Sequence, residues 1–213
     1  MRKIFLAMVL ALVMGVQNFC GAATIESAAF RGNDKLIYPV VTTGNAAVDA
    51  KINQKIEIEL GSFVKGLHYA AQYDGRRVMG AYTSYEVGSN QAGNTIILSL
   101  IITESSYYEG AAHPSTVKRA LNFNTSSGNK LGLNSLTDVG SGVSVEEIRD
   151  RVEVALVNKC QREKLTLFGD ALPLKKLPAE FYWDENLHVH FIFQQYEVAP
   201  YAVGIIDVDI DAD

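Results

Sequence analysis

Cysteine is scarce in this sequence, and its scarcity limits the covalent framework. The chain has 213 residues and two cysteines, Cys20 and Cys160. A lipidated Cys20 is disfavoured because Asn18 and Phe19 precede it, where a lipobox needs small or aliphatic residues. If Cys20 leaves with a cleaved N-terminal segment, an internal disulfide is excluded. Cys160 falls on the apolar face of a predicted helix, so we expect a small buried hydrophobic residue there.

The sequence also lacks the short motifs of several common enzyme classes. It has no Gly-x-Ser-x-Gly elbow, no His-Glu-x-x-His pair and no Walker A loop. We therefore expect a protein that is not an enzyme and that uses no cofactor and no metal. The alternative is a hydrolase that uses Glu109 and His113 as general acid and base, with Glu197 as a further candidate.

Long apolar runs are missing after the first residues of the chain. Arg2 and Lys3 precede the apolar run Ile4–Val16, whose 13 residues are too few to span a bilayer comfortably. The small residues Gly21-Ala22-Ala23 then offer a cleavage site after Ala22 or Ala23. These features predict a signal peptide over residues 1–23 and an exported protein, periplasmic or secreted, with no membrane span after cleavage.

Positive charge is in deficit. Removing Arg2 and Lys3 lowers the basic count from 19 to 17 against 24 acidic residues, a net charge of −7. Such a balance argues against a nucleic-acid partner and would steer the protein towards basic partners. The simpler interpretation is that the modest negative charge only keeps the protein soluble.

Apolar residues recur with two periods. Steps of three and four predict a helix from Val48 to Leu67 that Asn45 can cap, and a second helix opened by the capping box Ser144–Glu147. Alternation predicts strands over residues 35–42, 79–87, 95–103, 116–123, 187–193 and 205–210. The grouped strands indicate an α+β fold, with a mostly antiparallel sheet and two main helices packed on it. We expect a single domain over residues 24–213, with halves at 24–110 and 111–213.

The stretch from Ser105 to Pro114 is the least generic loop expected from the sequence. It connects two predicted strands and carries two tyrosines, a glutamate, a glycine and a histidine. Pro114 keeps His113 out of the helical region and presents it at the end of a strand. A turn with a capping histidine would explain the same residues.

Two further sets of polar residues lie near the C-terminus. His188 and His190 are two residues apart and could share a metal, although a polar outer face explains them as well. Four carboxylates could in principle hold Ca²⁺ but lack the usual loop and glycine, so we interpret them as charges that discourage edge pairing. They are Asp207, Asp209, Asp211 and Asp213.

Two motifs resemble a known family. Tyr108-Glu-Gly-Ala-Ala-His-Pro114, followed by Leu121-Asn-Phe-Asn, resembles a Gly-Gly-Ala-His-Pro and Tyr-Asn-Phe-Asp signature, with Ala111 where the family often has a second glycine. Tyr196-Glu-Val-Ala-Pro-Tyr-Ala-Val-Gly204 resembles its partner motif. Together they mark the extracellular domain of unknown function shared by RsiV-type lysozyme-sensing anti-sigma factors and the N-terminal region of some peptidoglycan deacetylases.

The resemblance implies an α+β binding module that grips lysozyme outside the cell. Only three residues precede the apolar run and no deacetylase domain follows, so the expected protein is a free exported copy of this module. Its expected partner is a lysozyme-like protein or peptidoglycan. We predict that the two motifs meet in space and that nine residues form the binding rim: Tyr107, Tyr108, Glu109, His113, Pro114, Tyr196, Glu197, Pro200 and Tyr201.

Overall fold

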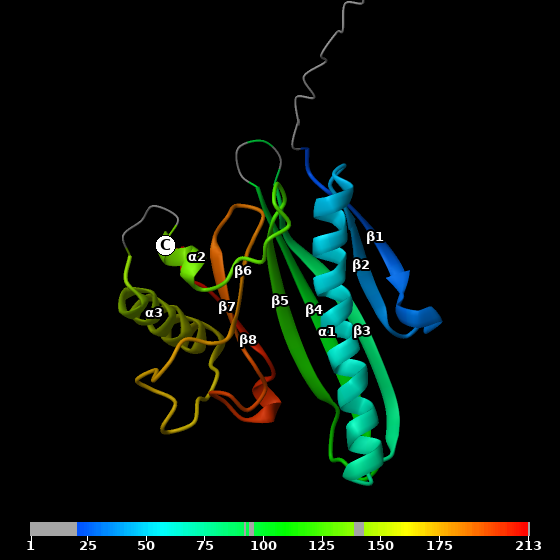
Figure 1. Cartoon of the computed structure of the whole chain (residues 1–213). Coiled ribbons are helices and arrows are strands. Elements are labelled where there is room, and N and C mark those ends of the chain that lie inside the picture. The colour runs from blue at the N-terminus through cyan, green and yellow to red at the C-terminus, as the bar shows by residue number, and fades with distance from the viewer. Residues whose placement is uncertain (1–20, 92, 94–95, 139–142, 213) are drawn as a thin grey trace, which may run out of the picture.

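The structure is a computed structural model that describes residues 21–91, 93, 96–138 and 143–212. It is an α+β fold of antiparallel sheets and helices, as the sequence predicts (Figure 1). Residues 1–20 of the predicted signal peptide, Cys20 among them, and Asp213 lie outside the described residues. None of the helices in the described part has the length and apolarity needed to cross a membrane.

The first half of the molecule is a long helix laid across a three-stranded sheet. Its elements are β1 (Thr24–Ala29), β2 (Ile37–Thr42), α1 (Ala46–Tyr73), β3 (Val78–Asn90), β4 (Ile97–Tyr108) and β5 (Ser115–Asn124), with a 3₁₀ turn over Phe30–Gly32. The sheet order is β3-β4-β5, and β1 and β2 form a separate ribbon. Leu36, next to β2, bridges to Thr83 of β3 and so joins the ribbon to the sheet.

Helix α1 begins where the sequence predicts. The side chain of Asn45 accepts hydrogen bonds from the backbone N–H groups of Ala47 at 3.1 Å and Val48 at 3.4 Å. The helix runs on to Tyr73, beyond the apolar stripe that predicts it, and its last three residues are exposed. Its buried stripe packs on core-facing residues of β4 and β5, and this first core includes Val48, Ile52, Ile56, Leu60, Leu98, Leu100, Ile102, Leu121 and Phe123.

Strand β4 is longer than expected. It continues through Ser105 and Ser106 to Tyr108, because these residues pair with β3 on one side and, through Ser106, with β5 on the other. The loop predicted over residues 105–114 is therefore wrong in its first four residues, and the turn itself is confined to 109–114. Strand β5 completes the first sheet, which therefore extends to Asn124.

The second half repeats the plan with shorter strands. Its elements are α2 (Asn134–Asp138), α3 (Val145–Glu163), β6 (Glu180–Trp183), β7 (Val189–Phe193), a 3₁₀ turn over Tyr201–Val203, and β8 (Ile206–Asp209). The Ser144 hydroxyl accepts a hydrogen bond from the Glu147 N–H at 3.1 Å, as the capping box predicts. Helix α3 covers a second core that includes Ile148, Val152, Leu156, Cys160, Phe181, Phe191, Phe193 and Val208. Cys160 is buried and free, as expected.

Polar side chains join the two halves along the outer edge of β5. Three of its outward N–H groups bind a side-chain oxygen of the second half: Thr116 binds Gln195 (3.1 Å), Lys118 binds Gln194 (3.0 Å) and Ala120 binds Glu180 (2.8 Å). The Gln194 amide also donates to the Lys118 carbonyl at 2.8 Å, so one side chain occupies both groups of that residue. These contacts protect an edge that would otherwise expose unpaired backbone groups.

Candidate functional site: an aromatic rim between two turns

The first turn of the candidate site connects β4 to β5. Gly110 sits at φ +76°, a conformation that side chains rarely adopt, and the Ala111 N–H donates to the Tyr108 carbonyl at 3.1 Å. The Tyr107 hydroxyl donates to the Ala111 carbonyl at 3.3 Å, and the Glu109 N–H donates to the Arg77 carbonyl at 2.9 Å. The turn is therefore held on both sides and presents His113 and Pro114 at its end.

The second turn connects β7 to β8. The Glu197 carboxylate accepts from the Gln194 N–H at 2.8 Å, and the Glu197 N–H donates to the Gln194 carbonyl at 3.1 Å. This closed turn places Tyr196 at φ +64°, in the left-handed region. A bulky residue in that region is strained, and such strain gathers at functional sites. Pro200 then begins the 3₁₀ turn that carries Tyr201.

Three aromatic side chains from these turns meet, and we call His113, Tyr196 and Tyr201 the aromatic rim. The rings of His113 and Tyr201 are stacked with centroids 3.5 Å apart. The Tyr196 hydroxyl lies 3.0 Å from Nε2 of His113, and its ring centroid is 5.8 Å from that of Tyr201. The sequence-based prediction that the two motifs meet in space is confirmed.

The hydrogen bonds of the rim select one tautomer of a neutral His113 ring. The Pro114 carbonyl can only accept, so Nδ1 of His113, at 3.1 Å, carries the proton in that bond. Nε2 of a neutral ring then accepts from the Tyr196 hydroxyl. The Tyr201 hydroxyl donates to the same Pro114 carbonyl at 3.2 Å. Tyr201 is partly buried and therefore braces the corner, whereas Tyr196 is 56% exposed.

The other predicted rim residues lie around this centre in different roles. Tyr107 is 40% exposed, and Glu109, Glu197 and Pro200 are also exposed. The Tyr108 ring lies 5.8 Å from the Arg76 guanidinium, and among the described residues it makes no ring contact with the three rim side chains. Within that same part of the chain, neither Glu109 nor Glu197 bonds to His113 through its carboxylate.

The two histidines near the C-terminus belong to a histidine–aspartate ladder. His188 lies 3.0 Å from Asp209, and His190 lies 2.8 Å from Asp207. The Asp209 hydrogen bond raises the pKa of His188. Burial alone would lower the pKa of His190, but the bond to Asp207 and the neighbouring carboxylates raise it. No cluster suited to a metal ion appears in the described residues.

The aspartates that were predicted to guard an edge are mostly paired. Asp207 also accepts from the Tyr182 hydroxyl at 2.8 Å, and Asp211 pairs with Arg151. Burial would raise the pKa of Asp209, but the Asp211 N–H and the two histidines together lower it. The ladder therefore fixes β8 to β7 and β6 and does not stand free in solvent.

A cluster of charged side chains around Arg119 in the first half is not among the features predicted from the sequence. Arg119 lies 3.2 Å from Glu180, 3.5 Å from Glu59 and 3.8 Å from Glu104. Glu104 is buried, and in the described structure its Oε1 has no hydrogen-bond partner. Burial and the Glu59 charge raise its pKa to about 7, against the opposing pull of Arg119. The signal was its position, because Glu104 continues the alternation that points Ile102 into the core.

The chain has an α+β fold that brings two turns together at the aromatic rim, and comparisons with known proteins agree on the fold. Residues 153–213, which include β6 to β8 and the second motif, match a family described as "Protein of unknown function (DUF3298)". A search of curated proteins found no match to this chain.

Two solved structures of that family resemble the chain. A DUF3298 family protein from Pseudomonas aeruginosa PAO1 is similar at 14% identity and a TM-score of 0.57, covering 88% of each chain. A member from Bacteroides fragilis NCTC 9343 has 18% identity and a TM-score of 0.48, covering 88% of this chain and 87% of its own. At this identity the first of them establishes a shared fold alone.

Proposed function

We propose that this chain is an exported, non-catalytic binding module of the cell envelope, and that the aromatic rim recognises a lysozyme-like enzyme or peptidoglycan. The observation that carries the proposal is the stack of His113 on Tyr201 at 3.5 Å with the exposed Tyr196 bonded beside it. Rings fixed in this way give contact area to a partner at little cost in entropy.

Charge favours a basic protein among the two partners. The chain without Arg2 and Lys3 carries a net charge of −7, from 17 basic and 24 acidic residues. A basic wall-lytic enzyme would be attracted to such a surface, and the attraction would weaken with added salt. The resemblance of both motifs to lysozyme-sensing domains supports the same partner.

The packing of Ala23 supports export with cleavage after Ala22. Ala23 is 7% exposed, its N–H donates to the Asn90 side chain at 2.9 Å, and its carbonyl accepts from the same amide at 2.7 Å. Cleavage after Ala22 keeps this paired residue in the mature chain. N-terminal sequencing of the exported protein should therefore read Ala23 first, and an uncut N-terminus would contradict export.

A three-part experiment tests the partner. The mature chain is titrated against a basic lysozyme, sedimented with purified peptidoglycan, and incubated with wall fragments that are then analysed for cleavage. We expect saturable, salt-sensitive binding to lysozyme or co-sedimentation with peptidoglycan, and no cleavage. Cleavage that is lost in a His113→Ala variant would instead establish the hydrolase alternative.

A further inference from the structure

Strand β8 forms an open edge of the second sheet. The sheet order is β6-β7-β8, so β8 pairs on one side only. The Ile210 N–H donates to the Val189 carbonyl at 3.0 Å. In an antiparallel pair, every second residue directs its N–H and C=O groups to the partner strand, so this bond shows which residues of β8 do so. Val208 and Ile206 therefore face β7 with their backbone groups, whereas the N–H and C=O groups of Asp207 and Asp209 point outward.

Other parts of the molecule bind outward backbone groups on both edges of the first three-stranded sheet. The outward N–H groups of β5 bind Gln194, Gln195 and Glu180, as described above. On the opposite side of that sheet, the Thr83 N–H of β3 donates to the Lys35 carbonyl at 2.9 Å. In the described part of the chain, no side chain or strand covers the outward backbone groups of Asp207 and Asp209 in this way.

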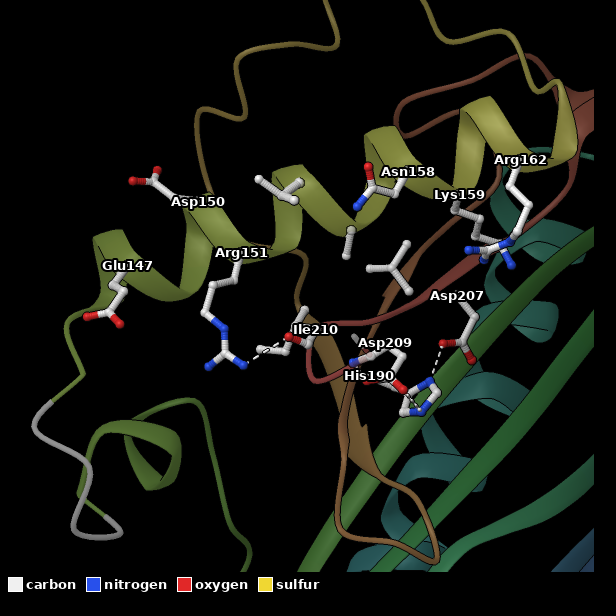
Figure 2. Close-up of a pocket in the computed structure, with 14 residues that line it drawn as sticks. Glu147, Asp150, Arg151, Asn158, Lys159, Arg162, His190, Asp207, Asp209 and Ile210 are labelled. Atoms are coloured by element: carbon white, nitrogen blue, oxygen red, sulfur yellow. Dashed lines mark hydrogen bonds and ion pairs between the residues drawn. The ribbon is translucent and has the colours of Figure 1, made fainter.

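A groove of about 540 Å³ runs between this open edge and helix α3. Val154, Ala155 and Val208 provide apolar surface in it, and Val154 is 59% exposed although it lies in the middle of the helix. Figure 2 shows α3 spanning one wall with β8 opposite it. An extended chain placed in the groove would pair with β8 on one side and touch the helix on the other.

Among the charged residues of α3 that line the groove, most at one end are acidic and those at the other end are basic. Glu147 and Asp150 line it at the start of α3, and Lys159 and Arg162 line it at the end of the helix (Figure 2). Arg151 donates to the Ile210 carbonyl at 2.9 Å and so anchors the chain just beyond β8. A chain that fits would carry a basic residue at the first end and an acidic residue at the other.

We propose that this groove, defined by α3 and the open edge of β8, is a second binding site, which takes an extended peptide of a partner protein as an added strand. Backbone pairing with Asp207 and Asp209 supplies affinity, and a small β-branched residue lies over Val154 and Ala155. Charges of opposite sign at the two ends of the peptide set its direction. The site is separate from the aromatic rim and does not depend on its function.

The test is a selection of random heptapeptides on the mature protein. Selected peptides should share a central Val, Ile or Thr between residues of opposite charge, and should bind a Val154→Arg variant about tenfold more weakly or worse. The matched control is Val145→Arg, because Val145 is 52% exposed on the same helix and does not line the groove. Peptides that bind both variants equally, or no selected peptides at all, would overturn the proposal.

A proline variant tests backbone pairing directly. Proline at position 209 removes an outward N–H without breaking the ladder to β7, a position that edge strands tolerate. Asp209→Pro should abolish peptide binding, whereas Asp209→Ala, which loses the same carboxylate, should retain it. Equal loss in the two variants would overturn strand addition. Sedimentation showing a dimer that Val154→Arg dissolves would also overturn it, because the edge would then pair with a second copy.

Discussion

The two halves of the molecule share one plan, a helix across a three-stranded antiparallel sheet, but they place their charged groups differently. The first half buries Glu104 beside the partly exposed Arg119 on the sheet face that α1 covers. The second half keeps its His188–Asp209 and His190–Asp207 pairs on the sheet face away from α3. The two halves therefore share an architecture but differ in where their charged groups lie. This difference in charge placement predicts how each half responds to mutation and pH.

The largest effect should come from emptying either core. Phe123 and Phe191 are fully buried, one in each half, so Phe→Ala at either position should cost about 3–5 kcal/mol. Trp183 is the only tryptophan and lies in the second core, so its fluorescence reports unfolding of that half.

Comparison of this fluorescence with far-ultraviolet circular dichroism shows whether the halves unfold together. The bonds across β5 couple them, so Phe123→Ala should shift the Trp183 transition as far as the circular dichroism transition. A Trp183 transition that stays at its wild-type position would show that the halves are independent.

The buried carboxyl of Glu104 should make stability depend on pH. Its pKa rises from 4.5 to about 7 on folding, so the folded state binds the proton more tightly than the unfolded state. Its contribution is favourable at low pH and is lost between pH 4.5 and about 7, a loss of about 3 kcal/mol for a shift of this size.

Chemical denaturation from pH 4 to 8 checks this dependence. The difference in stability between wild type and Glu104→Gln should change by that amount across the range, in favour of the variant at high pH. The control is Glu86→Gln, an exposed carboxyl whose removal should leave the wild-type profile in place. A constant difference for Glu104→Gln would contradict the burial argument.

Disrupting the contact between the two sheets at Gly88 should cause a smaller loss of stability. A Cβ on Gly88 would lie 2.6 Å from the Trp183 carbonyl oxygen and 2.7 Å from the Tyr182 ring. Gly88→Ala should therefore push the halves apart and cost about 1–3 kcal/mol. Gly80→Ala, on the same strand with open space around the position, is the control for intrinsic effects of alanine. Equal thermal shifts in the two variants would show that the sheets are not in tight contact.

Local sequence patterns predicted most of the helices and strands. They did not predict strands that form because they pair with residues elsewhere in the chain. The caps at Asn45 and Ser144 and the alternation in β4 and β5 are local signals, and the structure has them. Strand β1 was missed because its sequence, Thr24–Ala29, carries little apolar alternation and pairs with β2 across a turn. Strand β6 has only four residues. It is held in position by pairing with β7 and by the hydrogen bond that the Ala120 N–H of β5 donates to the Glu180 carboxylate.

The candidate site shows the same limit. The two motifs identified His113, Tyr196 and Tyr201, and the structure brings them together. The Gln194 and Gln195 side chains that hold the second turn against β5 could not be found, because no local pattern marks an amide that pairs with a distant strand edge. Tyr108 was grouped with the rim from its neighbours in sequence, but its ring lies against Arg76.

The most direct test of the account is the affinity of a Tyr196→Ala variant for lysozyme, measured by titration beside Tyr82→Ala. The two tyrosines are 56% and 53% exposed, so neither substitution empties a buried core position and both variants should stay folded. If the aromatic rim is the binding surface, Tyr196→Ala should weaken binding about tenfold or more, while Tyr82→Ala should bind as the wild type does. Equal affinity for wild type and Tyr196→Ala would contradict the claim that the aromatic rim is the binding surface.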